Sequence, residues 1–337
     1  RIQRKYGIEP YILLHKTAPF AQLPVEGKKS SSGPPRPEAW RNYLREFANV
    51  MQDEIPEGQN LYWEVWNEPD IGFFKGTTDQ YLEMLDIAFE EINKVDSADY
   101  HVMTGGFASV THLHGKKNMV ERVVTEAAND WEVFAYHRHG DFGMFREDIE
   151  EYLQPILSKS EKPIPVFLTE TGMDTRFGQH FQARELIKKI VYSWNRGYMA
   201  YTWFNLHDMS KATYDRRPGF TYGLYTRLDK KPNTEGYGPD VMDYANTYPK
   251  ASYIAMNTLN TVMQGFKSQK QLDMPGEQYT YTFTNKDQKI IVGWEQDQKA
   301  TSTLWLFSTD AEEAELVDIM GIKRRVPVVE GKVAFNV

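Results

Sequence analysis

The sequence predicts an α/β fold: a (β/α)8 barrel of the TIM type over residues 1–266, followed by a small antiparallel, β-sandwich-like domain over residues 267–337. In the first region, short runs of β-branched and aromatic residues alternate with stretches of helical periodicity, which is typical of a parallel sheet covered by helices. The connections that follow the strands are long, whereas those that return to the next strand are shorter. This asymmetry is typical of a barrel whose active face is built from the loops after the strands.

Six strands are predicted in the first region, at residues 8–14, 61–66, 101–105, 131–137, 165–169 and 198–204. A closed barrel of this kind has about eight strands, and the sequence begins with Arg1 rather than Met. We therefore expect two βα units to precede the sequence given. A doubly wound open sheet is the alternative fold. It would need a glycine-rich turn after its first strand, and residues 15–19 contain no glycine.

The spacing of apolar residues predicts helices between these strands. One begins at Pro37, a residue type favoured at the first helical position, and its apolar residues Trp40, Leu44 and Phe47 recur every three or four positions. Gly197 is expected to end another helix, in the position where glycine commonly follows the last turn. The helix that Gly197 ends is predicted at residues 180–196, and the remaining helices at 80–95, 118–128, 145–157 and 251–263.

Beyond residue 266 the pattern changes to short strands with frequent turns. Residues 279–284 alternate between tyrosine or phenylalanine and threonine, and a turn at 285–287 separates them from the apolar run 290–294. Further runs follow at 301–307 and 314–317. Short strands separated by turn residues predict the antiparallel β domain.

The composition excludes several kinds of partner and site. The net charge of −8 argues against a nucleic acid. The absence of cysteine rules out disulfides and thiolate metal sites, and no apolar stretch approaches the ~20 residues of a membrane span. The 8 Trp, 20 Tyr and 18 Phe supply flat faces that stack on sugars or fill a core. If a signal peptide precedes Arg1, we expect a secreted or periplasmic location; the oligomeric state is not indicated.

Two glutamates stand at strand ends. Glu68 follows the strand 61–66, and Glu170 follows the strand 165–169; each comes directly before a turn. A barrel enzyme places its chemistry at such positions, and glycoside hydrolysis requires two carboxyl groups. A buried Glu flanked by Trp is costly unless it is paired or protonated, and a general acid must be protonated near neutral pH. The alternatives are a helix-start residue for Glu68 and a solvated loop residue for Glu170.

The run Trp66-Asn67-Glu68-Pro69-Asp70 resembles the fourth-strand motif of the clan A glycoside hydrolases, most closely family 39, which includes β-xylosidases and α-L-iduronidases. The resemblance covers residues 8–265. It implies a retaining mechanism in which Glu68 is the acid/base, Asn67 binds the sugar 2-hydroxyl, and Glu170, three strands later, is the nucleophile. Retention implies carboxyl groups about 5–5.5 Å apart.

The same resemblance implies further substrate contacts. His137 ends the strand 131–137, the sixth of the barrel if two strands precede the sequence, and would orient the nucleophile or touch substrate. Trp203 would form the floor of the −1 sugar subsite. His15 has the position of the clan's third-strand contact residues, and the positions of His139, Asp208 and Tyr225 make them further predicted contacts. The alternatives are packing for Trp203 and Tyr225 and a structural barrel residue for His137. If the substrate carries a carboxylate, as iduronate does, a cation would bind it, with bidentate arginine best suited; the candidates are Arg138, Lys16 and Arg176.

His137 and His139 could also indicate a metal site, because two ligands at i and i+2 are a possible start of one. The sequence offers no evident third ligand, so we expect no metal and no cofactor. The function predicted is a retaining glycoside hydrolase acting on an oligosaccharide or polysaccharide. A non-catalytic carbohydrate-binding barrel and a transglycosylase remain the alternatives.

Overall fold

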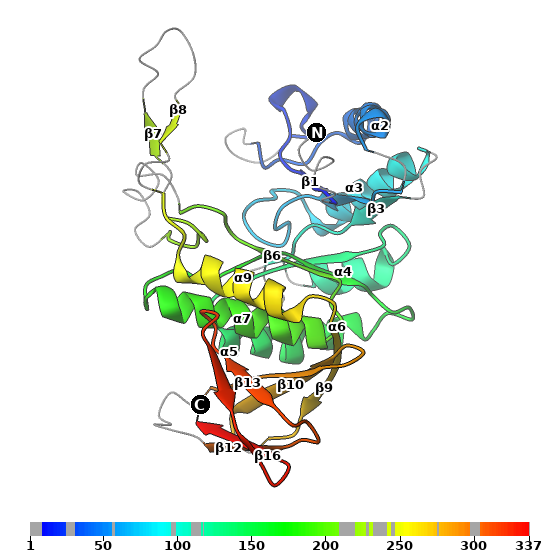
Figure 1. Ribbon diagram of the computed structural model, residues 1–337. Helices are drawn as coiled ribbons and strands as arrows, with labels where there is room; N and C mark the ends of the chain where they lie inside the picture. Colours follow the sequence, from blue (N-terminus) through cyan, green and yellow to red (C-terminus); the bar gives the residue numbers. More distant parts are fainter. Residues whose placement is uncertain are drawn as a thin grey trace. The chain divides into compact units, whose positions relative to one another are not determined.

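The structure is a computed structural model, shown in Figure 1. It describes residues 9–24, 31–55, 58–95, 99–108, 116, 118–208, 220–226, 229–231, 241–243, 247–274, 276–296 and 304–336. The chain divides into two compact units. The first comprises Arg1–His139, Gly143–Thr171 and Tyr198–Thr202, and the second comprises Gly140–Phe142, Gly172–Gly197 and Trp203–Val337.

Six strands in chain order form two three-stranded sheets, and all six correspond to predicted strands. The sheets are β1-β2-β3 and β4-β5-β6. The strands are β1 (Tyr11–Leu14), β2 (Leu61–Val65), β3 (Tyr100–Met103), β4 (Phe134–His139), β5 (Val166–Gly172) and β6 (Ala200–Trp203). The first three pair in parallel, with Tyr11 opposite Tyr62 and Leu61 opposite Tyr100. A parallel bridge from Met103 to Val133 links the two sheets.

In the second sheet, β4 and β5 are also parallel, as their backbone bonds show. The amide of Phe134 donates to the carbonyl of Pro165 at the beginning of β4, and the amide of Gly140 donates to the carbonyl of Gly172 just after its end. When the residue numbers of successive hydrogen-bond partners rise along both strands, the two strands are parallel. β4 begins three residues later than predicted, at Phe134 rather than Trp131. The α/β prediction is therefore confirmed.

Helices connect these strands. The first unit contains α2 (Pro37–Glu54), α3 (Thr78–Asn93), α4 (Met119–Glu126), the π-helical turn η2 (Asp148–Leu153) and α6 (Gln154–Leu157), with α5 (Phe142–Glu147) at its border. Thr77 caps α3 through a capping box with Gln80, which satisfies two amides that the helix start leaves free. A short 3-10 helix, η1 (Pro19–Ala21), follows β1.

One apolar layer draws a residue from every strand of the first unit. Met103, Ala135 and Phe167 lie buried in it on β3, β4 and β5, together with Val133. The partly buried residues that pack against it come from the other three strands: Tyr11, Tyr62 and Ala200. Leu61, Trp63 and Val65 of β2 are fully buried at alternate positions, on the other side of the strand from Tyr62. Both faces of β2 are thus covered, as expected for a parallel strand.

The second unit contains two long helices and antiparallel strands. Figure 1 shows α7 (Gln179–Asn195) and α9 (Ala251–Met263) lying side by side, and they pack closely. Gly197 follows α7 with the positive φ of 75° expected there. The remaining strands of this unit are β7 (Asp229–Lys231), β8 (Val241–Asp243), β9 (Lys267–Leu272), β10 (Gln278–Thr284), β11 (Lys289–Glu295), β12 (Leu304–Ser308), β13 (Ala314–Val317), β14 (Lys323–Val326), β15 (Val328–Val329) and β16 (Lys332–Asn336).

All pairs among these strands are antiparallel, as predicted for the C-terminal region. They form the sheets β11-β10-β9 and β12-β16-β15 and the pairs β13-β14 and β7-β8. The domain boundary at residue 266 and a sandwich arrangement stay predictions. Within the described part of the chain, no helix is both long and apolar enough to span a membrane.

Candidate active site

Glu68 is held where the chain turns sharply after β2. Trp66 and Glu68 both adopt the left-handed backbone region, with φ of 79° and 45°, which costs a non-glycine residue roughly 1–2 kcal/mol. Backbone bonds hold this turn in place, because the amide of Glu68 donates to the carbonyl of Gly106 over 3.1 Å. The indole of Trp66 is fully buried and donates to the carbonyl of Phe73. The turn thus fixes the direction of the Glu68 side chain.

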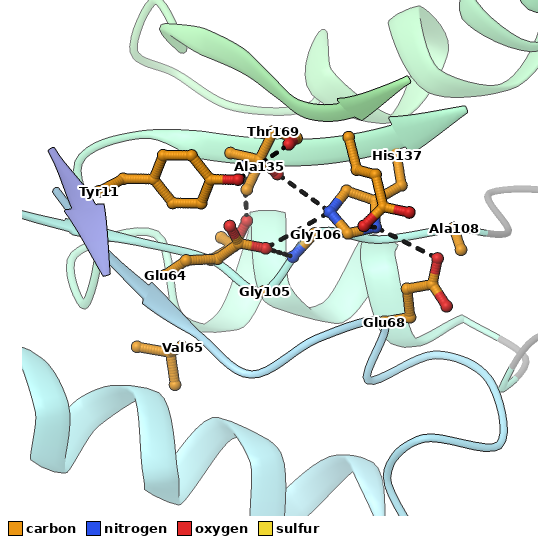
Figure 2. A network of polar contacts seen from close by, with 12 residues as sticks. Tyr11, Glu64, Val65, Glu68, Gly105, Gly106, Ala108, Ala135, His137 and Thr169 are labelled. Atoms are coloured by element: carbon orange, nitrogen blue, oxygen red, sulfur yellow. Dashed lines mark hydrogen bonds and ion pairs between the residues drawn. The ribbon is translucent and has the colours of Figure 1, made fainter. Parts of the chain in front are cut away.

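His137 lies between the two glutamates that the sequence singles out. Its Nδ1 is 3.2 Å from Oε1 of Glu68 and 4.0 Å from Oε2 of Glu170. Its Nε2 is 3.1 Å from Oγ1 of Thr169 and 3.5 Å from Oε1 of Glu64 (Figure 2). The ring is only 2% exposed. Three strand ends, those of β2, β4 and β5, thus meet at one imidazole.

The surroundings of His137 favour its charged form. Burial lowers the pKa of the imidazole, but the bonds to Glu64 and Glu68 and the charge of Glu170 outweigh burial and raise that pKa to about 10. The ring therefore carries its proton at neutral pH, and both of its nitrogens donate.

Glu170 is held in its ionised form by two histidines. Burial alone would raise the pKa of its carboxyl group, but the bond from His139, whose Nε2 is 2.9 Å from Oε1, and the charges of His137 and His139 lower the pKa below its ordinary value. The Glu170 side chain is 24% exposed, so a ligand can reach it. An ionised and accessible carboxylate is what a nucleophile requires.

The two carboxyl groups approach each other closely. One carboxylate oxygen of Glu68, one of Glu170 and a ring nitrogen of His137 all lie within 4.8 Å of one another. The same three atoms are close enough to bind a metal ion together. Metal binding requires a neutral imidazole, however, and the raised pKa of His137 opposes it.

Four residues at this site were not predicted from the sequence: Glu64, Gly106, Thr169 and Tyr11. Glu64 is 1% exposed, and its Oε1 accepts the amide of Gly106 over 2.9 Å. The hydroxyl of Tyr11 donates to the carbonyl of Thr169 over 3.1 Å. The sequence feature that could have identified Glu64 is its charge: it stands between Trp63 and Val65, inside a strand that is otherwise apolar or aromatic.

His15 and Asn67 lie in the same unit as the glutamates. The His15 ring stacks on Trp66, with centroids 5.4 Å apart and planes 14° apart. Burial lowers the pKa of His15, and Lys16 lowers it further, so this imidazole is neutral at pH 7. Asn67 forms a parallel bridge to Gly106. Both positions suit the predicted substrate contacts, which stay predictions.

Three predicted substrate contacts belong to the second unit. Trp203 is 7% exposed and donates its indole N–H to the carbonyl of Tyr222 over 2.8 Å. Oδ1 of Asp208 accepts from Nζ of Lys250 and from the amide of Gly223, each over 2.8 Å. The roles of Trp203 and Asp208 as substrate contacts stay predictions. So does that of Tyr225, whose ring packs 4.7 Å from the ring of Tyr253.

The candidate cations for a substrate carboxylate are largely engaged. Nε of Arg138 lies 2.6 Å from Oδ2 of Asp148, and the guanidinium of Arg176 binds both carboxylate oxygens of Asp174. Of the three candidates, Lys16 alone has no carboxylate partner among the described contacts, and its side chain is exposed.

No protein-family model and no curated protein matches the sequence. Solved structures do match. A family 39 glycoside hydrolase from the gut symbiont Bacteroides cellulosilyticus WH2 aligns with 99% of this chain at a TM-score of 0.66 and 18% identity. A monomeric beta-xylosidase from Caulobacter crescentus CB15 aligns with 85% at 0.53 and 17%. The family 39 enzyme from Xanthomonas axonopodis pv. citri aligns with 97% at 0.54 and 13%.

The resemblance to family 39 is thus confirmed at the level of the fold. The chain spans 66%, 61% and 75% of the lengths of these three proteins.

Proposed function

We propose that this chain carries the active site of a retaining glycoside hydrolase that cleaves O-glycosidic bonds of an oligosaccharide or polysaccharide. The observation that supports it most is the close approach of Glu68 and Glu170, whose nearest oxygens lie within 4.8 Å around the His137 ring. In this proposal the six parallel strands are the third to the eighth of a (β/α)8 barrel, and the glutamates end the fourth and the seventh.

Each glutamate has a separate role in this reaction. The ionised carboxylate of Glu170 attacks the anomeric carbon while Glu68 gives its proton to the leaving oxygen, which forms a covalent glycosyl-enzyme. Glu68 then takes a proton from water, and the water displaces Glu170 from the sugar. His139 and the charged His137 support the first step, because both lower the pKa of Glu170.

A neutral sugar is the favoured substrate. A uronate would need a cation, and the two arginines, Arg138 and Arg176, already bind Asp148 and Asp174. That leaves Lys16, whose ammonium group cannot bind a carboxylate in the bidentate way of an arginine. Kinetics on aryl xylosides, arabinosides, glucosides, galactosides and iduronides would test this preference. Selective turnover of the iduronide would contradict it.

The double displacement is tested by Glu170→Ala in the full protein. Turnover of an aryl glycoside should be abolished, and added azide should restore release of the phenol and yield a glycosyl azide of inverted configuration. Glu132→Ala is the matched control. Glu132 lies just before the start of β4, whereas the site lies toward strand ends, and its carboxylate accepts the amide of Val102. Turnover of Glu170→Ala at the wild-type rate would refute the assignment.

Product analysis separates the alternatives. A carbohydrate-binding barrel would bind sugar without releasing the phenol from any aryl glycoside. A transglycosylase would transfer the sugar to an added acceptor sugar in preference to water. Hydrolysis with retention at the anomeric carbon, followed by NMR, supports the glycoside hydrolase.

A further inference from the structure

A third carboxylate, Glu64, is buried beside the two glutamates assigned to the reaction. Its side chain is 1% exposed, and its Oε1 lies 3.5 Å from Nε2 of His137. An isolated buried carboxylate is costly unless it is paired and hydrogen-bonded. Glu64 meets both conditions, because Oε1 also accepts the amide of Gly106 over 2.9 Å. Figure 2 shows Glu64 on one side of the His137 ring and Glu68 on the other.

Gly106 leaves the space that the His137 ring occupies. A Cβ atom at this position would lie 2.0 Å from Nε2 and 2.4 Å from Cδ2 of the ring, and neither atom could tolerate such an approach. The backbone of Gly106 also joins two glutamates: its amide donates to Glu64, and its carbonyl accepts the amide of Glu68 over 3.1 Å. One residue thus connects the buried carboxylate, the acid/base and the ring between them.

We propose that Glu64 and Gly106 are positioning residues that hold His137, in its charged form, between the acid/base Glu68 and the nucleophile Glu170. Glu64 supplies the negative charge that retains the ring proton, and Gly106 supplies the space and the backbone bonds. The inference rests on the glycosidase reaction proposed above for the roles of Glu68 and Glu170. Neither positioning residue touches the reacting atoms.

The charges that face the His137 ring explain why Glu64 matters. From β2 come Glu64 and, just beyond its end, Glu68; from β5 comes Glu170. Tyr11 of β1 lies near Glu64 and Glu170, and burial followed by these two charges raises the pKa of its hydroxyl, so it stays neutral. Three carboxyl groups therefore surround one imidazolium, and Glu64 is the most deeply buried of them. Its hydrogen bond is the leading cause that raises the pKa of His137.

The test is Glu64→Gln, which keeps the side-chain size and removes the charge. The His137 titration, followed by NMR with labelled histidine and assigned through His137→Gln, should move down by about 1–3 pH units, the range for losing an opposite charge at this distance. The alkaline limb of kcat/KM should move to lower pH, because the His137 ring loses its proton earlier. At pH 7, kcat should fall by about 10²-fold. Glu64→Asp should restore the alkaline limb.

Two matched controls separate positioning from general structural damage. Glu132→Gln removes a carboxylate that also accepts a backbone amide and also lies 3.5 Å from a histidine ring, that of His101, and it should leave kcat/KM and its pH profile unchanged. Gly106→Ala should displace the His137 resonance and lower kcat. Gly72→Ala, where an added Cβ meets nothing within 4 Å, should do neither.

An unchanged His137 titration in Glu64→Gln overturns the proposal. A loss of activity by the same factor at every pH also overturns it, because a residue with a merely structural role would lower activity without moving the pH profile. The NMR titration needs no substrate. If it moves as expected in a protein that hydrolyses no glycoside, the glycosidase assignment fails while the pairing of Glu64 with His137 stands.

Discussion

Nε2 of His139 lies 2.9 Å from Oε1 of Glu170, and the two residues stand at the ends of neighbouring strands, β4 and β5. Both side chains are partly exposed, at 31% and 24%, so this pair faces solvent while His137 lies buried behind it. His139 therefore lowers the pKa of Glu170 from the accessible side.

We expect His139→Ala to raise the pKa of Glu170. Burial raises the pKa of Glu170, and the bond from His139 is the largest of the contacts that lower it. Without that bond, burial is opposed less. Because Glu170 must be ionised to attack, the acid limb of kcat/KM should move to higher pH, while the rate on the plateau changes less. pH profiles of hydrolysis measure this. His101→Ala, whose ring bonds Asn60 instead, is the control, and an acid limb that stays in place in His139→Ala contradicts the prediction.

Glu68→Ala should make the rate depend on the leaving group. Without a general acid, an alkyl glycoside should lose about 10²–10⁴-fold in kcat/KM. A dinitrophenyl glycoside, which leaves without a proton, should still form the glycosyl-enzyme. Added azide should then accelerate turnover and give a glycosyl azide of retained configuration, in contrast to the inverted product of Glu170→Ala. Equal losses on both substrates would show that Glu68 does not donate the proton.

The sequence predicts this fold well where the signal is local. Hydrophobic runs between turn residues predict six strands that all form, and apolar periodicity predicts α9 with the bounds it has, Ala251–Met263. The π-helical turn Asp148–Leu153 lies inside the predicted helix 145–157 and was not predicted, because a widened turn has nearly the same apolar spacing as an α-helix. The start of β4 was predicted three residues early at Trp131, whose ring packs against Phe134.

The site is predictable only in part, because some of its contacts join residues that are far apart in the sequence. Glu68 follows β2, whereas His137, His139 and Glu170 lie toward the ends of β4 and β5. Such strand ends are where a barrel gathers its site, so their meeting could be expected. Glu64 lies inside its strand, and its partner Gly106 is 42 residues away. No local pattern reports that such a carboxylate points at a histidine on another strand, since this depends on the register of β2, β3 and β4 together.

Tyr81 is a buried link between the strand ends that carry Glu68 and Gly106. Its hydroxyl donates to the carbonyl of Val65 over 3.0 Å and accepts the amide of Gly105 over 2.6 Å. Tyr81→Phe leaves a buried amide without its partner, which should cost about 1–3 kcal/mol in the free energy of unfolding, and kcat should fall as these ends loosen. Urea unfolding and kinetics measure both. Tyr43→Phe, at an exposed ring on α2, should change neither, and a Tyr81→Phe protein as stable as wild type would contradict the role.

Glu91 of α3 stabilises the fold away from the site, and its effect depends on pH. Its side chain is fully buried and binds Nη1 of Arg41 at 2.7 Å, Nε of Arg45 at 3.0 Å and Nζ of Lys94 at 2.6 Å. Burial would raise the pKa of this carboxyl, but the three cations lower it from its ordinary 4.5 to about 2. A carboxyl whose pKa is lower in the folded state stabilises the fold above the unfolded pKa, and the effect is lost as pH falls through the folded pKa.

Glu91→Gln should therefore lower the free energy of unfolding by about 1–3 kcal/mol at pH 7, less than a fully buried pair would because its cations are partly exposed. The difference from wild type should persist down to about pH 5 and shrink between there and about pH 2. Glu90→Gln is the matched control: Glu90 binds the same Arg41 at 2.7 Å, but its side chain is 47% exposed, so its loss should cost under about 1 kcal/mol. Urea unfolding across this pH range measures both, and a difference that grows on acidification would show that Glu91 does not act through its charge.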